Sequence, residues 1–150
     1  MSAGDTVHAS VACVGGRGVV IRGRSGSGKS SLLLALVSSR DVDAVLVADD
    51  RVHLAAAGGR LMAAVPESIA GLMEVRGVGI VRRDHVSPVA VDLVVDLLPL
   101  AECPRLPDAS EAVVRLEGVV LPRIFIAIGA HDGVARVAAA LARSAVAIPA

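Results

Sequence analysis

The 150-residue sequence predicts one α/β domain built around a mixed β-sheet, and three observations lead to this fold class. The apolar segment Val19–Ile21 is followed by the glycine-rich loop Gly23–Ser30 and then by the leucine-rich run Ser31–Val37, in the order strand, loop, helix. Further short apolar runs, separated by Gly, Asp and Arg, are typical of strands. Gly15–Gly18 predicts a hairpin, which gives the strand before the loop an antiparallel neighbour. The sheet is therefore expected to be mixed and not purely parallel.

The remaining elements follow from local patterns. Pro66–Met73 predicts a helical turn or a short capped helix, and Asp108–Ala109 indicates a turn. Val134–Ala147 is rich in alanine and carries two arginines, which is typical of a terminal helix. No linker or internal repeat divides the chain, so a single domain over residues 1–150 is expected. Strands are expected over Val7–Val14, Gly18–Ile21, Ala44–Val47, Arg51–Ala55, Gly77–Val81, Val89–Leu97, Leu116–Leu121 and Arg123–Ile128.

The composition excludes several classes of partner. The hydrophobic fraction is 54%, but Phe125 is the only aromatic residue, so recognition of single-stranded nucleic acid by base stacking is not expected. The net charge is zero, with 15 basic and 15 acidic residues, and no basic tail or patch points to DNA or an anionic membrane. We therefore expect neither a nucleic acid nor a membrane as partner.

Cysteine usage and the termini predict a soluble cytoplasmic protein. Cys13 and Cys103 have neither metal-ligand spacing nor a disulfide framework, so both are expected to be small apolar residues in a reducing compartment. The N-terminus lacks the basic and apolar regions of a signal peptide. The apolar stretch Val86–Leu100 carries two aspartates and two prolines and is too short to span a bilayer.

The loop at Gly23–Ser30 carries the pattern of a phosphate-binding loop. Its glycines allow backbone N–H groups to surround phosphate oxygens, and the following helix offers its positive N-terminus to the same anion. Lys29 is the only lysine among 15 basic residues, and it stands where an ammonium reaches the β- and γ-phosphates. Ser30 supplies a hydroxyl for Mg²⁺. The residues expected to bind ATP are Gly23, Arg24, Ser25, Gly26, Ser27, Gly28, Lys29, Ser30 and Ser31.

Two adjacent carboxylates end the next expected strand. Asp49 and Asp50 follow Val45–Ala48 and can hold Mg²⁺ or accept a proton from an attacking hydroxyl. The pair allows divided roles, in which one carboxylate faces the metal or the fold while the other faces the nucleophile. The alternative is that both only cap the following turn.

A third segment, Leu72–Ile80, combines charge with glycine. Glu74 and Arg76 are two residues apart and would point to the same side of an extended chain, while Gly77 and Gly79 permit close backbone approach. The alternative to a functional role is that Glu74 and Arg76 form a solvated ion pair at a strand edge.

Together, these three segments resemble the HPr kinase/phosphorylase family, the serine kinases of bacterial phosphotransferase systems. The phosphate loop, the Ala48–Val52 segment and the Glu74–Ile80 signature occur in that family's order and approximate spacing, and the resemblance covers about His8 to Phe125. It implies an HPr kinase/PEP carboxykinase-like P-loop fold. It also implies the short, alphaproteobacterial form, a catalytic domain without an N-terminal regulatory domain.

The resemblance implies a role for individual residues. Asp50 matches the proton acceptor from the target serine, and His8 matches the histidine that assists it. Lys29 would stabilise the phosphates, and Ser30 and Glu74 match the Mg²⁺ ligands, with Asp49 and Arg76 as further candidates. Arg105 aligns with a catalytic arginine. The implied cofactors are ATP and Mg²⁺, the implied partner is an HPr-like phosphocarrier protein, and the implied assembly is a hexamer.

One departure from the family concerns dephosphorylation. Members that also dephosphorylate their target usually carry a Pro- and Arg-rich turn after a Pro-Lys-Ile-type strand. Here Leu121–Ile124 keeps the strand, but the turn is Gly129–Gly133, without arginine. This difference argues against a phosphorolysis reaction.

The expected function is therefore an ATP- and Mg²⁺-dependent protein serine kinase that phosphorylates HPr. Two alternatives remain open from the residues. One is a P-loop kinase or ATPase whose acceptor is not a protein, although no arginine-rich lid is evident. The other is a nucleotide-sensing regulatory module without turnover, although Lys29, Asp50 and Glu74 are all present.

Overall fold

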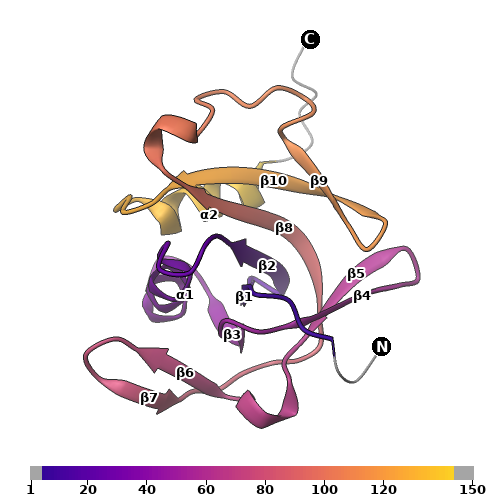
Figure 1. Cartoon of the computed structure of the whole chain (residues 1–150). Helices are drawn as coiled ribbons and strands as arrows, with labels where there is room; N and C mark the ends of the chain where they lie inside the picture. Colours follow the sequence, from indigo (N-terminus) through magenta and orange to yellow (C-terminus); the bar gives the residue numbers. More distant parts are fainter. Residues whose placement is uncertain (1–4, 144–150) are drawn as a thin grey trace.

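The computed structural model of the chain describes residues 5–143 and confirms the α/β class with a mixed sheet (Figure 1). Eight strands form one sheet whose main order is β3-β1-β2-β8-β10-β9, and the hairpin β4–β5 joins it through β8. Strands β6 and β7 form a separate two-stranded hairpin. The strands are β1 (Ser10–Val14), β2 (Arg17–Arg22), β3 (Ala44–Ala48), β4 (His53–Ala57), β5 (Arg60–Ala64), β6 (Leu72–Val75), β7 (Gly79–Arg82), β8 (Val89–Leu98), β9 (Val113–Leu116) and β10 (Val119–Ala127). The helices are α1 (Lys29–Ser38) and α2 (Gly133–Ala142), and short 3-10 turns occupy Glu67–Ile69 and Leu100–Glu102.

Strand direction places several loops at one edge of the sheet. Strand β8 runs parallel to both β2 and β10, whereas β1 is antiparallel to both β2 and β3. Strand β3 therefore runs in the same direction as β2, and the carboxyl ends of β2, β3, β8 and β10 meet at one edge. In open α/β sheets this edge is where ligands bind.

The predicted first hairpin is confirmed, and its turn explains the two glycines. Gly15 and Gly16 have φ angles of 57° and 81°, a left-handed backbone conformation that residues other than glycine rarely adopt. Positive φ at both turn positions matches the twist of a two-residue hairpin. The turn therefore fixes the register Val14↔Arg17 and, from it, the full β1–β2 ladder.

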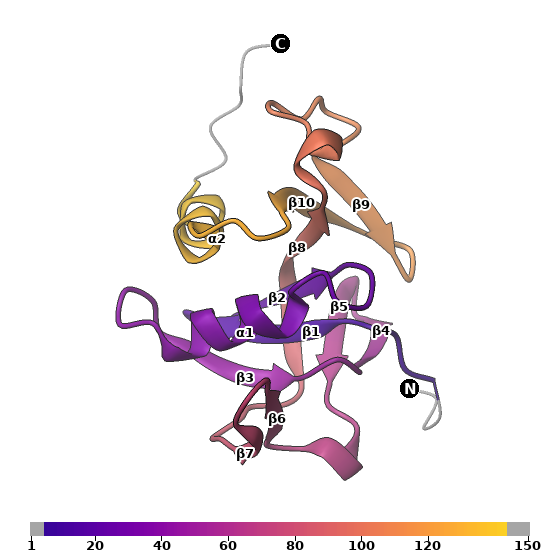
Figure 2. The same ribbon diagram turned by 60° about the vertical axis from the view of Figure 1, so that its left-hand side comes forward.

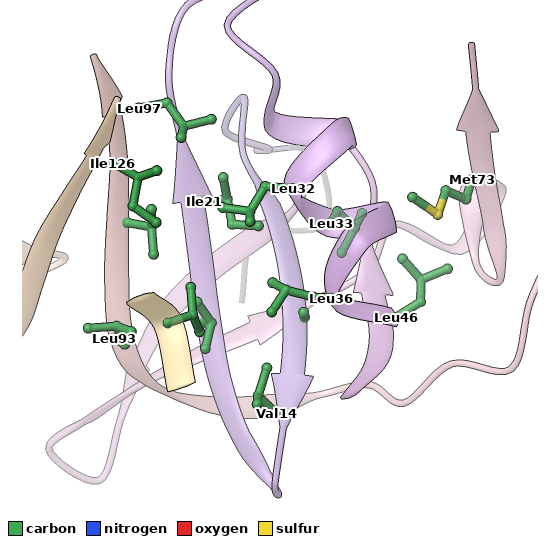
Figure 3. Close-up of a cluster of buried hydrophobic side chains, with 14 residues drawn as sticks. Val14, Ile21, Leu32, Leu33, Leu36, Leu46, Met73, Leu93, Leu97 and Ile126 are labelled. Atoms are coloured by element: carbon green, nitrogen blue, oxygen red, sulfur yellow. The ribbon is translucent and has the colours of Figure 1, made fainter. Parts of the chain in front are cut away.

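The sheet has an apolar core on each face, because successive side chains of a strand point to opposite sides. Val19 and Ile21 of β2 join the core that α1 covers, while Val20 joins the other core together with Leu61 of β5. Figure 3 shows the first core, in which the leucines of α1 pack over residues from the central strands. Both faces of β2 are thus buried, which explains why Val19–Ile21 is uniformly apolar.

The two helices hold the phosphate loop and the last turn near each other. Helix α1 lies over β1 and β3, and α2 lies beside β10 (Figure 2). Gly133 at the start of α2 approaches α1 closely, since a Cβ atom there would lie 2.8 Å from Leu32 Cδ1. Of the predicted helix Val134–Ala147, the structure places Val134–Ala142 in α2, and residues 144–147 lie outside the described residues.

One strand prediction was wrong. Leu116–Leu121 is not one strand, because Glu117 and Gly118 turn the chain with φ angles of 49° and 78° between β9 and β10. The helical turn predicted in Pro66–Met73 is confirmed as the 3-10 turn Glu67–Ile69, and β6 begins at Leu72, before the end of the predicted segment. Strand β5 was not predicted, because its alanine-rich sequence lacks β-branched residues. Strand β4 begins at His53, two residues after its predicted start at Arg51.

Two further observations concern the cysteines and the helices. Cys13 is buried, and this burial raises the pKa of its thiol, while Cys103 is half-buried. Over residues 5–143, neither α1 nor α2 has the length and apolar character needed to cross a membrane.

Candidate active site

A cavity of about 400 Å³ opens at the carboxyl edge of the sheet, in front of the N-terminus of α1. Three elements supply its polar lining: the phosphate loop, the end of β3 and the β6–β7 hairpin. These elements are far apart in sequence, and they correspond to the three segments singled out above. The predicted site residues that line it are Ser25, Gly26, Gly28, Lys29, Ser30, Ser31, Asp49, Asp50, Glu74 and Arg76.

The phosphate loop needs glycine at two positions. Gly26 and Gly28 have φ angles of 80° and 98°, where any side chain would be strained. Gly28 is also the N-cap of α1 and provides no side-chain oxygen, so the first N–H groups of the helix have no capping partner from it. They are available to an anion, which the helix dipole also favours.

Lys29 is held inside the loop. Its side chain is buried, and its Nζ donates hydrogen bonds to the carbonyl oxygens of Gly23 at 2.9 Å and of Arg24 at 3.1 Å. A buried ammonium keeps its charge only when hydrogen bonds of this kind compensate for the lost water. The loop therefore presents a positioned positive charge to the cavity.

Asp49 connects three elements through its carboxylate. Its Oδ1 accepts a hydrogen bond of 2.7 Å from Ser30 Oγ, and its Oδ2 accepts one of 2.9 Å from the Glu74 backbone N–H. Ser10 Oγ of β1 lies 3.4 Å from the same Oδ1. Asp49 is largely buried, with 9% of its surface exposed, so these contacts also satisfy a charge that has little contact with water.

Asp50 faces away from this network. Its φ angle is +67°, a left-handed conformation that is uncommon outside glycine but that Asp and Asn tolerate best. Its backbone N–H donates to Ser10 Oγ at 2.9 Å, and its Oδ1 lies 3.5 Å from His8 Nδ1. The side chains of His8 and Asp50 are 65% and 54% exposed, so both are accessible to a second molecule. The two adjacent aspartates thus occupy different environments, one internal and one open.

Glu74 and Arg76 both line the cavity, but not for the predicted reason. Strand β6 ends at Val75, and Arg76 lies in the turn before β7, so the two side chains do not share one side of an extended strand. Strand pairing of Glu74 with Ile80 holds the hairpin, and the bond from the Glu74 N–H to Asp49 attaches it to β3. The hairpin brings both side chains to the cavity.

Arg105 does not lie with the other predicted residues. It is exposed, in the segment between the 3-10 turn Leu100–Glu102 and β9, and it is not part of the cavity lining. Gly23, Arg24, Ser27 and His8 also lie outside the lining, although Gly23 and Arg24 hold Lys29 and His8 approaches Asp50.

Sequence reasoning missed Ser10. The Oγ of this fully buried residue contacts the Asp49 carboxylate and accepts a hydrogen bond from the Asp50 backbone N–H. Ser10 therefore helps to position both aspartates. A lone serine within the apolar run Val7–Val14 is the signal that could have indicated it, because a buried hydroxyl requires a partner.

The donor set of the cavity fits Mg²⁺. The Ser30 hydroxyl and the Asp49 and Glu74 carboxylates are oxygen ligands, which hard cations prefer. Within residues 5–143, no group of three or more His, Cys, Asp or Glu residues forms a complete metal site. Mg²⁺ usually takes one or two carboxylates and completes its shell with water and substrate phosphates.

The sequence is similar to several named proteins. A 36% identity over 134 residues relates it to the HPr kinase/phosphorylase of Streptococcus thermophilus, covering 81% of this chain and 41% of that protein. The HPr kinase/phosphorylase of Brevibacillus brevis is 44% identical over 77 residues, which are 51% of this chain and 24% of that protein. The chain thus spans less than half the length of these curated relatives.

The fold and a family model agree with these similarities. The solved structure of the HPr(Ser) kinase/phosphatase from Coxiella burnetii superposes with a TM-score of 0.74 at 24% identity, covering 91% of this chain and 93% of that one. The model of the HPr Serine kinase C-terminal domain matches residues 1–146. Since that match includes the phosphate loop, both aspartates and the β6–β7 hairpin, the chain belongs to the HPr serine kinase C-terminal domain family.

Proposed function

We propose that this protein is an ATP- and Mg²⁺-dependent serine kinase whose substrate is an HPr-like phosphocarrier protein. One observation carries the proposal: phosphate-binding groups and an accessible carboxylate, Asp50, line the same cavity. Phosphoryl transfer requires mainly positioning and charge stabilisation, and these groups are suited to both.

The phosphate loop would bind the triphosphate of the donor. Its backbone N–H groups and the N-terminus of α1 would hold the phosphate oxygens, and Lys29 would move from the Gly23 and Arg24 carbonyls to the γ-phosphate side. Ser30, Asp49 and Glu74 are the residues that would hold Mg²⁺, which neutralises phosphate charge when bound. The Ser30–Asp49 hydrogen bond keeps the first two side chains adjacent.

Asp50 would act as the general base. The hydroxyl oxygen of the target serine attacks the γ-phosphorus, its proton passes to the Asp50 carboxylate, and the bond from phosphorus to the ADP oxygen breaks. His8, with Nδ1 3.5 Å from Asp50 Oδ1, would orient the carboxylate. The open surroundings of both side chains suit a protein substrate that must bring its serine to them.

Three further properties belong to this proposal. We expect a homo-oligomer, because large apolar side chains are exposed at several places, Val78, Ile80, Leu100 and Leu106 among them. We expect a cytoplasmic location from the cysteine usage described above. We also expect little phosphorolysis, since no arginine occupies the turn Gly129–Gly133.

The test is intact-mass analysis of purified HPr after incubation with this protein, Mg²⁺ and ATP. We expect the addition of one phosphate on a serine. Asp50→Asn should still bind ATP but transfer phosphate about 10²–10⁴-fold more slowly, the usual range for a general base. Transfer at an equal rate by Asp50→Asn would refute the role of Asp50. ATP binding without any transfer to HPr would refute the substrate and favour the sensing module or a different acceptor.

A further inference from the structure

A cluster of three charged side chains lies on the sheet at the carboxyl end of β2, outside the cavity lining described above. Arg22, the last residue of β2, pairs in register with Asp96 of β8. Its Nε donates to Asp96 Oδ1 at 2.8 Å, and its Nη2 donates to Oδ2 at 2.9 Å. On the other neighbouring strand, β10, Arg123 donates from Nη1 to Asp96 Oδ2 at 3.4 Å. The function proposed above gives none of these three residues a role.

The geometry of the cluster is more informative than its contribution to stability. The Asp96 side chain is 14% exposed, and both arginine side chains are partly buried. Ion pairs removed from water in this way add little stability, because the lost hydration opposes the attraction of the charges. Two parallel hydrogen bonds between a guanidinium and a carboxylate do, however, require one relative orientation of the two groups. The pair Arg22–Asp96 therefore fixes the end of β2 against β8.

The phosphate loop begins at this fixed end, and Figure 1 shows it leaving β2 beside β8 and leading to α1. Gly23 follows Arg22 directly, and its carbonyl oxygen accepts the 2.9 Å hydrogen bond from Lys29 Nζ. Gly23 also packs closely, since a Cβ atom there would lie 3.2 Å from Leu97 Cβ and would collide with Ser27 Oγ. A shift of β2 relative to β8 would therefore displace the carbonyl that holds Lys29.

Arg123 supports the cluster from the side of β10. Its Nε donates to the Glu111 carbonyl oxygen at 2.9 Å, and its backbone N–H donates to the Ala112 carbonyl oxygen at 2.8 Å. Its guanidinium carbon lies 4.7 Å from the centre of the Phe125 ring, a favourable cation–π arrangement. The Asp96 carboxylate is thus bound from both neighbouring strands, which restricts its position further.

We infer that Arg22 and Asp96 are positioning residues for the phosphate loop. Their ion pair sets the place of Gly23 and, through the Gly23 carbonyl, the place of Lys29 before the donor's phosphates arrive. The inference rests on the proposed function, because it assumes that the loop binds the phosphates of the donor. Both residues act through Gly23 and Lys29 and not by contact with the phosphates.

Two variants separate position from charge. Arg22→Lys keeps the positive charge but loses the planar fork of donors. Asp96→Asn removes a negative charge, which by electrostatics alone would tighten the binding of a polyanion. If the pair positions the loop, each variant should instead bind MgATP about tenfold more weakly, because small misplacements of binding groups are costly. Calorimetry on the whole protein measures the affinity, and unchanged or tighter binding in both variants would overturn the inference.

Inorganic tripolyphosphate shows whether the loss concerns the phosphate loop. It carries the phosphates without a nucleoside, so with Mg²⁺ it should lose about the same factor of ten as ATP in both variants. A loss confined to ATP would contradict the inference. The double variant, Arg22→Lys with Asp96→Asn, should bind no more weakly than the single variants, because each change removes the same contact. Additive losses would likewise contradict it.

The same strand offers a matched control. Asp92 of β8 also lies between two arginines, with Arg17 Nε at 3.6 Å and Arg60 Nη2 at 3.1 Å. It precedes Asp96 by four residues, about 13 Å along the strand, on the side away from the phosphate loop. Asp92→Asn should therefore leave the affinity for both ligands unchanged. A loss equal to that of Asp96→Asn would overturn the inference, because it would show a general effect of charge or stability in β8.

Kinetics distinguish a positioning role from a merely structural one. If HPr is phosphorylated, Arg22→Lys and Asp96→Asn should raise KM for ATP about tenfold. A merely structural role would lower the fraction of folded protein and so the apparent kcat, with KM unchanged, and this result would refute the inference while leaving the kinase function standing. Weaker binding of ATP and tripolyphosphate in both variants, without any transfer to HPr by the unaltered protein, would refute the kinase function and support the inference.

Discussion

Asp50 combines backbone strain with an exposed carboxylate. A φ angle of +67° is unfavourable for a side chain-bearing residue, and strained residues of this kind concentrate at functional sites. The hydrogen bond from its N–H to Ser10 helps to hold the conformation. The structure therefore keeps the carboxylate in place at a cost in stability.

The first prediction concerns this strain. Asp50→Gly should raise the free energy of unfolding by about 1 kcal/mol, because glycine adopts positive φ without the Cβ clash. The same variant should lose phosphate transfer, since it has no carboxylate. Urea denaturation checks the stability, with Asp50→Asn as the control, because Asn keeps the side-chain shape and also tolerates this conformation. A less stable Asp50→Gly protein would contradict the prediction.

The second prediction concerns Asp49, whose carboxylate accepts bonds from Ser30 and from the Glu74 N–H. Asp49→Asn keeps the shape but removes the charge next to the expected Mg²⁺ site. Stimulation of nucleotide binding by Mg²⁺ should require about tenfold more metal, the scale of effect for a lost metal-site residue. A Mg²⁺ titration of ATP binding measures it, and Asp41→Asn, an exposed aspartate beyond α1, should titrate like the unaltered protein.

At the scale of elements, helix α1 gains little stability from capping or charged side chains at its ends. Gly28 gives it no side-chain cap, and its first turn contains no acidic residue. Leucines at Leu32, Leu33 and Leu36 instead anchor it in the core under the phosphate loop. Helix stability of this kind comes from tertiary packing and leaves the N-terminal N–H groups for a ligand.

The third prediction follows from that packing. Leu33 is fully buried, so Leu33→Ala should lower the free energy of unfolding by about 2–5 kcal/mol through lost contacts and a cavity. Leu106, which is 86% exposed, is the matched control, and Leu106→Ala should change stability by less than about 0.5 kcal/mol. Chemical denaturation monitored by circular dichroism distinguishes the two. Equal losses would mean that α1 does not depend on its buried face.

For the whole molecule, ligand binding at the sheet edge should stabilise the fold. A ligand that binds only the folded state at 100 times its Kd adds about 2.7 kcal/mol, which raises the Tm of a protein of this size by about 5–10 °C. The phosphate loop, β3 and the β6–β7 hairpin all line the first cavity, so the effect should be global.

The fourth prediction tests this stabilisation. MgATP should raise the Tm of the protein by that amount, and Lys29→Met should remove most of the rise, because Lys29 is the ammonium of the loop. Arg40→Met changes an exposed basic residue just after α1 and should keep the full rise. Thermal unfolding with and without MgATP is the measurement. A full rise in Lys29→Met would exclude this lysine from nucleotide binding.

The sequence by itself determined the fold class, the phosphate loop with its flanking strand and helix, the β1–β2 hairpin and the family, because each depends on neighbouring residues or on a contiguous motif. Only the tertiary structure decided the rest. Val and Leu on both sides of Glu117–Gly118 concealed the β9–β10 turn, and the role of Ser10 depends on Asp49, 39 positions away. A second cavity, of about 320 Å³, likewise lies between α1 and the β10–α2 turn, which are about 100 residues apart in the sequence. Such contacts are set by how strands and helices pack, and local sequence patterns do not encode distances between segments that meet only in the folded chain.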